Sequence, residues 1–223
     1  MSDASSTKED YLKVCAELGK QGDPEILAVL NSAVDDSFLE PVVEFELHLH
    51  GNKRNERNEM YRRRLTDEDA SILYKMLKTN TFIVGMDLGY NIIGDEGATV
   101  LGQLLQETVC LRWLVLSYND IGPVGGQAIA KGLQVFFFSV CERLVICSNN
   151  IASEGLCAIS RAMRSNGSLY SVYIWGNKLE EPACRAFQDL LNGPVPRLNP
   201  RNTDVEPYVV DGVVYLARLS SPF

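Results

Sequence analysis

Residues 114–121 read Leu-Val-Leu-Ser-Tyr-Asn-Asp-Ile, and this stretch decides the fold because its pattern recurs along the chain. Apolar residues stand five and three positions before Asn119 and two positions after it. The same spacing surrounds three other asparagines, so the marker residues are Asn91, Asn119, Asn149 and Asn177, which lie 28, 30 and 28 residues apart. A period of this length indicates a repeat architecture.

Each unit combines the pattern of a short strand with that of a helix. The apolar residues before the marker alternate, as on one face of a strand, whereas small and apolar residues after it return every three to four positions. Such a unit must stack on its neighbours to bury its apolar face. At the bend after the strand, the asparagine side chain can bond to the backbone of its own and the adjacent unit. The sequence therefore predicts an α/β fold, a right-handed βα solenoid of about five repeats with a parallel concave sheet and outer helices.

A fifth, degenerate unit precedes these four and carries an insertion at 53–64. Its strand half ends at a further marker, Asn52, and its helix half reappears at Leu65. Asn52 and Asn91 are 39 residues apart, 11 more than the usual 28. The inserted loop is basic, with Lys53, Arg54, Arg57, Arg62, Arg63 and Arg64. A solvated loop is the preferred interpretation, and contact with RNA or a role in nuclear import are the alternatives.

The array predicts a division of the chain into three parts. Exposed repeat ends need caps, and two helical patterns before residue 40 predict an N-terminal helical cap at 1–40. The repeats then occupy 41–193, with an irregular seam at 135–141 where the longer spacing falls. Residues 194–223 begin with prolines and place Asp211-Gly212 between two β-rich runs, which predicts a Pro-rich linker and a hairpin cap.

Composition limits the functions that this chain can have. The net charge is -8 at pH 7 and the isoelectric point is near 4.9, which makes nucleic acid an unlikely partner. No uncharged apolar run reaches the length of a membrane span, and the first 20 residues have no signal pattern. The six cysteines include no C-x-x-C pair, so free thiols are expected. These observations predict a monomer of the cytoplasm and nucleus, without membrane contact.

Strand residues between the apolar positions face the other side of the sheet, which is the concave surface. The predicted protein-binding residues on this surface are Glu46, His48, His50, Asp87, Trp113, Ser117, Arg143, Tyr173 and Trp175. Trp, Tyr and Arg are the residue types most enriched in interface hot spots. The alternative is that these aromatic side chains pack on one another or on the C-terminal segment.

Catalytic, metal and cofactor sites find little support in the sequence. His48 and His50 share a strand face, where a metal site with Glu46 is the less favoured alternative to a solvated or partner-facing pair. A hydrolase would need Cys147 beside one of these histidines, yet their strands are three spacings of about 4.8 Å apart, which is roughly 14 Å and beyond hydrogen-bond reach. No phosphate-binding glycine motif exists, and the sequon at Asn166 is expected to be bare. We therefore expect no catalytic residue, no metal and no cofactor.

The motif L-x-L-x-x-N-x-I/L over residues 45–191 resembles the ribonuclease-inhibitor-like class of leucine-rich repeats. Two strings, 173–178 (Tyr-Ile-Trp-Gly-Asn-Lys) and 202–212, are similar to one member of that class with a longer array. This resemblance implies a shortened form that lacks central repeats near the seam. It also implies a non-catalytic interaction scaffold with nuclear or nucleolar protein partners in stem or germ cells. A GTPase-activating regulator of the same class and a truncated isoform with little function are the alternatives.

Overall fold

The computed structural model describes residues 2–39, 43–51, 63–134 and 139–219. Five parallel strands form one sheet in sequential order. They are β1 (Phe45–His48), β2 (Ile83–Asp87), β3 (Trp113–Val115), β4 (Arg143–Val145) and β5 (Ser171–Tyr173). Asn52, the inserted residues Lys53, Arg54, Arg57 and Arg62, and positions 135–138 of the predicted seam lie outside the described residues.

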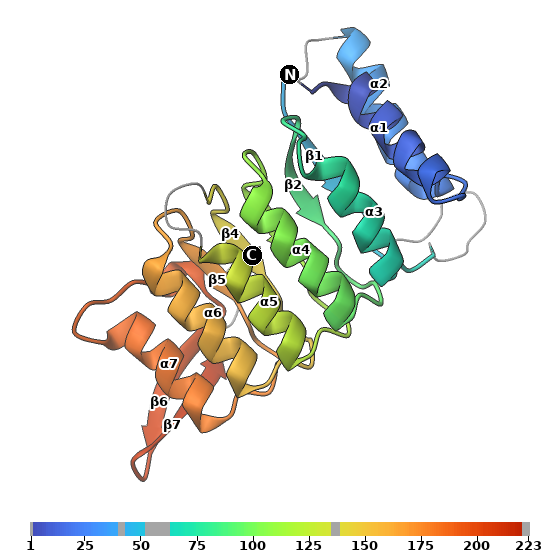
Figure 1. The fold of residues 1–223 in the computed structure, drawn as a ribbon. Coiled ribbons are helices and arrows are strands. Elements are labelled where there is room, and N and C mark those ends of the chain that lie inside the picture. Colours follow the sequence, from blue (N-terminus) through green and yellow to red (C-terminus); the bar gives the residue numbers. More distant parts are fainter. Residues whose placement is uncertain (1, 40–42, 52–62, 135–138, 220–223) are drawn as a thin grey trace.

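A helix follows each strand, and these helices form one layer along the sheet (Figure 1). They are α3 (Asp67–Leu77), α4 (Asp95–Glu107), α5 (Pro123–Leu133), α6 (Ser153–Ser165) and α7 (Glu181–Asn192). This alternation of parallel strands and helices confirms the predicted βα solenoid. The apolar positions of the strands form the core, and the rung Leu47, Met86, Leu114, Leu144 and Val172 is fully buried.

Small residues set the close spacing of the central helices. A Cβ atom on Gly132 of α5 would lie 2.1 Å from the carbonyl oxygen of Gly102 in α4. A Cβ on Gly102 would in turn lie 2.5 Å from the carbonyl oxygen of Ala128. Backbone atoms cannot move aside as the end of a flexible side chain can, so only glycine allows this approach.

The marker asparagines join each repeat to the one before it. The Asn119 amide nitrogen donates to the carbonyl of Leu88 in the preceding repeat at 2.9 Å, and its Oδ1 accepts from the Ile93 amide at 3.0 Å. It also donates to Leu116 in its own repeat at 3.1 Å. The side chains of Asn91, Asn149 and Asn177 make the equivalent bonds. These contacts satisfy backbone groups at bends where the sheet ladder has ended.

A second set of buried polar side chains closes the turns between helix and strand. Oδ1 of Asn80 accepts the backbone amides of Phe82 and Ile83, each at 2.8 Å. Asn166 makes the same pair of bonds before β5, and Thr108 supplies a hydroxyl at the equivalent turn. Asn166 is 2 % exposed and also donates to the Leu133 carbonyl at 2.7 Å, so the fold leaves this sequon no room for a glycan.

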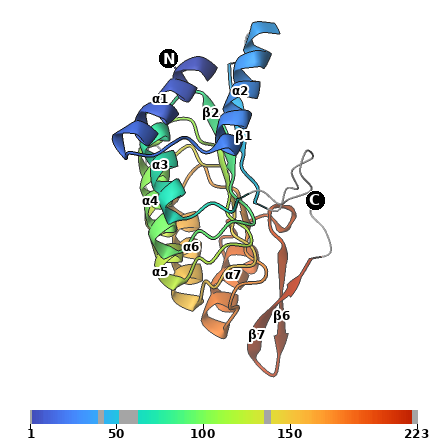
Figure 2. The ribbon, with the colours of Figure 1, turned by 90° about the vertical axis from the view of Figure 1, so that its right-hand side faces the viewer.

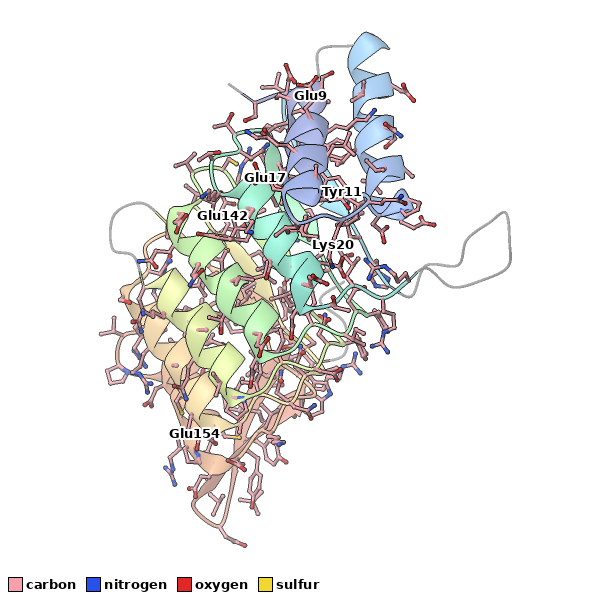
Figure 3. The ribbon with its side chains drawn as sticks, turned by 45° about the vertical axis from the view of Figure 1, so that its right-hand side comes forward. Glu9, Tyr11, Glu17, Lys20, Glu142 and Glu154 are labelled. Carbon is pink, nitrogen blue, oxygen red and sulfur yellow. The ribbon has the colours of Figure 1, made fainter. Side chains whose placement is uncertain are left out.

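Two helices, α1 (Ala4–Glu17) and α2 (Pro24–Leu39), lie at the β1 end of the sheet (Figure 1). Tyr11 of α1 is buried, and its hydroxyl accepts the amide hydrogen of Asp23, the residue before α2 (Figure 3). Lys20, which follows α1, forms an ion pair with Glu68 of α3. These contacts attach the helical pair to the first repeat.

One residue of the predicted insertion also connects these elements. Arg63 donates to Asp23 at 2.9 Å and to both carboxylate oxygens of Asp69, at 2.7 and 3.0 Å. Asp69 is the third residue of α3 and accepts the Thr66 amide in a capping box. Burial raises the pKa of the Asp69 carboxyl, but the bonds from Arg63 and Thr66 outweigh burial and leave the pKa below its ordinary 3.8.

At the other end, a short 3-10 helix η1 (Pro200–Asn202) leads into the antiparallel hairpin of β6 (Val205–Val210) and β7 (Val213–Arg218). The hairpin turns at Asp211 and Gly212, both with positive φ, and extends from the body of the protein (Figure 2). The division at residues 40 and 193 stays a prediction. No helix in the described part of the chain has the length and apolar character needed to cross a bilayer.

Replacement of Asn119 by alanine should destabilise the whole array. It leaves the Ile93 amide buried without its partner and removes one of the two side-chain bonds to the Leu88 carbonyl, the other of which comes from Asn91, so we expect the free energy of unfolding to fall by about 2 kcal/mol. Asn150→Ala is the matched control, because Asn150 is exposed and should change stability by less than about 0.5 kcal/mol. Urea unfolding followed by circular dichroism measures both, and equal effects would contradict the role of the marker asparagines.

Asp69→Asn tests the ion pair with Arg63 through the pH dependence of stability. Because the folded-state pKa of Asp69 is lowered, its contribution is present at neutral pH and is lost as the pH falls below 3.8 towards the folded-state pKa. The variant should be less stable at pH 7, by roughly 2 kcal/mol, and should lose less stability on acidification. Thermal unfolding across pH shows this, with Asp10→Asn on an exposed position of α1 as the control.

Candidate functional site

The concave face of the sheet forms an open groove of about 1170 Å³. All five strands or the turns that follow them contribute to it, and the segment around the C-terminal hairpin closes one end. Its lining comprises Glu46, His48, His50, Asp87, Gly89, Tyr90, Trp113, Val115, Ser117, Tyr118, Arg143, Val145, Cys147, Ser148, Trp175, Asp204, Arg218 and Leu219. We call this surface the concave groove.

Trp113 forms part of the floor of the concave groove. Its indole lies over Gly85 of the neighbouring strand, where an added Cβ would come within 1.9 Å of the ring. The indole Nε1 donates to Glu46 Oε1 at 3.2 Å, and the ring of His48 lies 5.7 Å away between centroids. The missing side chain at Gly85 thus allows a large aromatic surface to lie flat across β2.

A row of stacked rings forms the rim at the carboxyl ends of the first strands. The rings of Tyr90 and Tyr118 stack at 4.1 Å between centroids, and His50 lies 4.6 Å from Tyr90. Both tyrosines have positive φ, 57° and 56°, and each directly precedes a marker asparagine. Ser148 and Gly176 hold the same left-handed conformation in the next two repeats. The bend of each repeat therefore requires this backbone state, and in two repeats it presents a tyrosine at the rim.

Asp204 completes the sheet at its C-terminal end. In the inner repeats, the amide after each strand donates to a carbonyl of the next strand, as Ile146 donates to Tyr173. No further strand of the described residues pairs with β5, and the Asp204 carboxylate accepts the amides of Ile174 and Trp175 at 2.8 and 3.0 Å. This aspartate is 5 % exposed, and its carboxylate supplies the hydrogen-bond acceptors that a sixth strand would otherwise supply.

The thiol of Cys147 also donates to Asp204, at 3.0 Å. Burial raises the pKa of this thiol well above its ordinary value, and the negative charge of Asp204 raises it further. Burial likewise raises the pKa of Cys141 to about 12. Nucleophilic cysteines need a lowered pKa, so neither thiol is prepared for catalysis. No cluster of three potential metal ligands occurs among the described residues.

Eight of the nine residues predicted for protein binding line the concave groove. Tyr173 does not, because it is only 6 % exposed. Sequence reasoning missed the rim tyrosines and the residues Asp204, Arg218 and Leu219 of the C-terminal segment. The tyrosines could have been found from their position before the marker asparagines. No repeat pattern marks the C-terminal residues, because they reach the groove through the return of the chain.

The parallel sheet, the asparagine bonds and the helix layer define a leucine-rich repeat βα solenoid. A family model described as Leucine Rich repeat matches residues 79–102 and 109–130. The chain is similar to Leucine-rich repeat-containing protein 34 of Homo sapiens, with 51 % identity over 78 residues, and to the proteins of that name in Mus musculus and Rattus norvegicus, each with 49 %. The leucine-rich repeat resemblance in the sequence is thus confirmed.

These similarities have a limited extent. The matched residues are 35 % of this chain and 16 % of the human protein, or 18 % of the mouse and rat proteins. The chain therefore spans less than a fifth of these relatives. Among solved structures, a chain named Leiomodin-1 Actin-Binding Site 2 aligns with a TM-score of 0.50 and 18 % identity, over 73 % of this chain and 85 % of that one. This likeness concerns the fold.

Asp204→Asn should weaken the C-terminal closure and expose Cys147. An amide keeps only one oxygen acceptor, so the backbone amide of Ile174 or of Trp175 loses its partner, which should lower the free energy of unfolding by about 2 kcal/mol. Removal of the negative charge also lowers the pKa of Cys147, so its alkylation by iodoacetamide should become faster. Mass spectrometry measures the rate against Cys157 in the same chain.

Asp211→Asn is the control for this variant, because it makes the same change at the exposed tip of the hairpin, where asparagine tolerates positive φ. Unchanged stability and thiol reactivity in Asp204→Asn would contradict the role of Asp204 as the hydrogen-bond acceptor at the end of the sheet.

Proposed function

We propose that this chain is a non-catalytic scaffold that binds a partner protein in the concave groove. The observation that carries the proposal is the composition of the groove, where both tryptophans of the chain meet unburied charged side chains. Trp, Tyr and Arg dominate the binding energy of protein interfaces. A mixed aromatic and charged groove is therefore suited to a protein surface or segment.

The rigidity of the groove supports this proposal. Trp113 is held by Gly85 beneath it and by Glu46 at its edge, and the rim tyrosines stack on each other. Side chains that are ordered before binding lose little conformational entropy when a partner arrives. The marker asparagines give the underlying sheet the same order from repeat to repeat.

The absence of catalysis is part of the proposal and rests on chemistry. Cys147, the one cysteine that lines the groove, donates a hydrogen bond to Asp204, and the pKa of its thiol is raised. The histidines of the groove, His48 and His50, stand at the end of the first strand and just after it, at the edge of the sheet opposite to the edge that Asp204 occupies. This arrangement favours binding over nucleophilic chemistry.

Two finer parts of the proposal rest only on the amino-acid sequence and the resemblance that it carries. They are a location in the cytoplasm and nucleus, with the nucleolus included, and protein partners that act in stem or germ cells. The leiomodin-1 chain bears the name of an actin-binding site of that protein. At 18 % identity the likeness is one of fold, so actin is not part of our proposal.

Val115→Arg should abolish partner capture without unfolding the protein. Val115 lies in the middle of the groove floor, and its side chain points away from the core of L-x-L residues. A long charged side chain there fills the space that a partner would occupy. The measurement is the set of proteins captured from a cell lysate by the variant and the wild type, each checked by circular dichroism and thermal unfolding.

Val124→Arg is the matched control, because Val124 is 63 % exposed on α5 in the helix layer. It should capture the same proteins as the wild type. If a folded Val115→Arg protein retained every partner, or if the wild type captured nothing, the concave groove would not be the binding surface.

A further inference from the structure

Two arginines of the concave groove, Arg143 and Arg218, have no side-chain partner among the described residues. Some arginines outside the groove are paired with carboxylates, as Arg112 is with Glu44 and Arg185 is with Glu181. Arg143 is exposed on β4, and Arg218 ends β7 beside the Asp204 turn, so both stand in the C-terminal half of the groove. The groove thus keeps two positive charges available in a chain whose net charge is -8.

The opposite half of the groove carries negative charge. Glu46 lies on β1 and Asp87 on β2, and both line the same surface as the arginines. Trp113 on β3 lies between these halves, with its ring over β2. Along the sheet, the exposed charges of the groove therefore run from acidic side chains, across an aromatic floor, to basic side chains, while Asp204 at the basic end is buried and already accepts the Ile174 and Trp175 amides.

We propose that the groove binds an extended peptide segment of a protein partner in which an acidic side chain and a basic side chain stand about four residues apart. This inference rests on the function proposed above and specifies the chemistry of the partner. The acidic side chain pairs with Arg143 and Arg218, where a carboxylate can accept two parallel bonds from a guanidinium. The basic side chain pairs with Glu46 and Asp87.

The spacing follows from the geometry of the sheet. Glu46 and Arg143 lie on β1 and β4, which are three strand positions apart. Strands lie about 4.8 Å apart, so the two charges are separated by roughly 14 Å across the sheet. An extended peptide advances about 3.3 Å per residue and covers this distance in about four residues. The side chains between the two charges then lie over Trp113.

The same charges disfavour a nucleic acid. A single strand carries a negative phosphate at every nucleotide, so a strand long enough to reach both halves would place phosphates against Glu46 and Asp87. A peptide with one charge of each sign meets a complementary charge at both ends of the groove.

The experiment follows tryptophan fluorescence during titration with synthetic peptides, because the chain has two tryptophans and both line the groove. The probes are twelve-residue peptides with an apolar centre and carry both charges four residues apart, the acidic charge alone, the basic charge alone, or neither. The peptide with both charges should bind most tightly, and loss of the acidic residue should weaken binding about tenfold.

Charge reversal provides the decisive comparison. Arg143→Glu should weaken binding of the two-charge peptide by at least about tenfold, and a peptide with two basic residues at the same spacing should then bind better than it binds the wild type. Arg164→Glu, an exposed change on α6, is the control and should leave every affinity unchanged.

Three results would overturn the inference. They are equal affinity for the charged and neutral peptides, no fluorescence change with any peptide at millimolar concentration, and tighter binding of a single-stranded oligonucleotide than of the two-charge peptide. The function proposed above is judged separately. If Val115→Arg abolished capture from a lysate while Arg143→Glu retained it, the groove would remain the binding surface and only the charge pattern would be wrong.

Discussion

The fold depends on four asparagine side chains, Asn91, Asn119, Asn149 and Asn177, each of which bonds to two repeats at once. The strands β3, β4 and β5 are only three residues long, so the sheet ladder ends before the chain has turned towards the helix. Backbone groups at this bend would be buried without partners, and Asn119 and its equivalents provide both a donor and an acceptor there. The register between repeats, the position of each helix and the curvature of the groove all follow from this shared bond.

The chemistry of the groove is set by the strand positions on the concave face, where the repeat does not require a particular residue. A repeat needs apolar residues on the core face and an asparagine at the bend, but it does not specify the residues on the concave face. At those positions the chain places Trp113 above Gly85 and separates acidic from basic side chains. The left-handed residue before the asparagine is a partial exception, because Tyr90 and Tyr118 combine a backbone requirement with an aromatic rim.

The repeats could be predicted from the sequence because their physical cause is periodic. Each apolar position returns with the same spacing, and even the displaced Leu65 bonds to Asn91 as its later counterparts bond to theirs. The turn residues Asn80 and Asn166 follow the same periodicity and were overlooked because they belong to no apolar pattern. The burial of Tyr173 and the presence of Arg218 in the groove depend on how the last thirty residues fold back, which no repeat pattern encodes.

The carboxylate of Asp204 has a consequence for the modularity of this architecture. Its two oxygens accept the amides of Ile174 and Trp175, and in the inner repeats the amide equivalent to Ile174 donates to a carbonyl of the next strand. Every inner repeat offers the amide equivalent to Ile174 to its neighbour, as Leu116 does to Val145, so the C-terminal segment can in principle be grafted behind other repeats. The number of repeats could then be reduced or increased by protein engineering while the same C-terminal segment with Asp204 is kept as the cap.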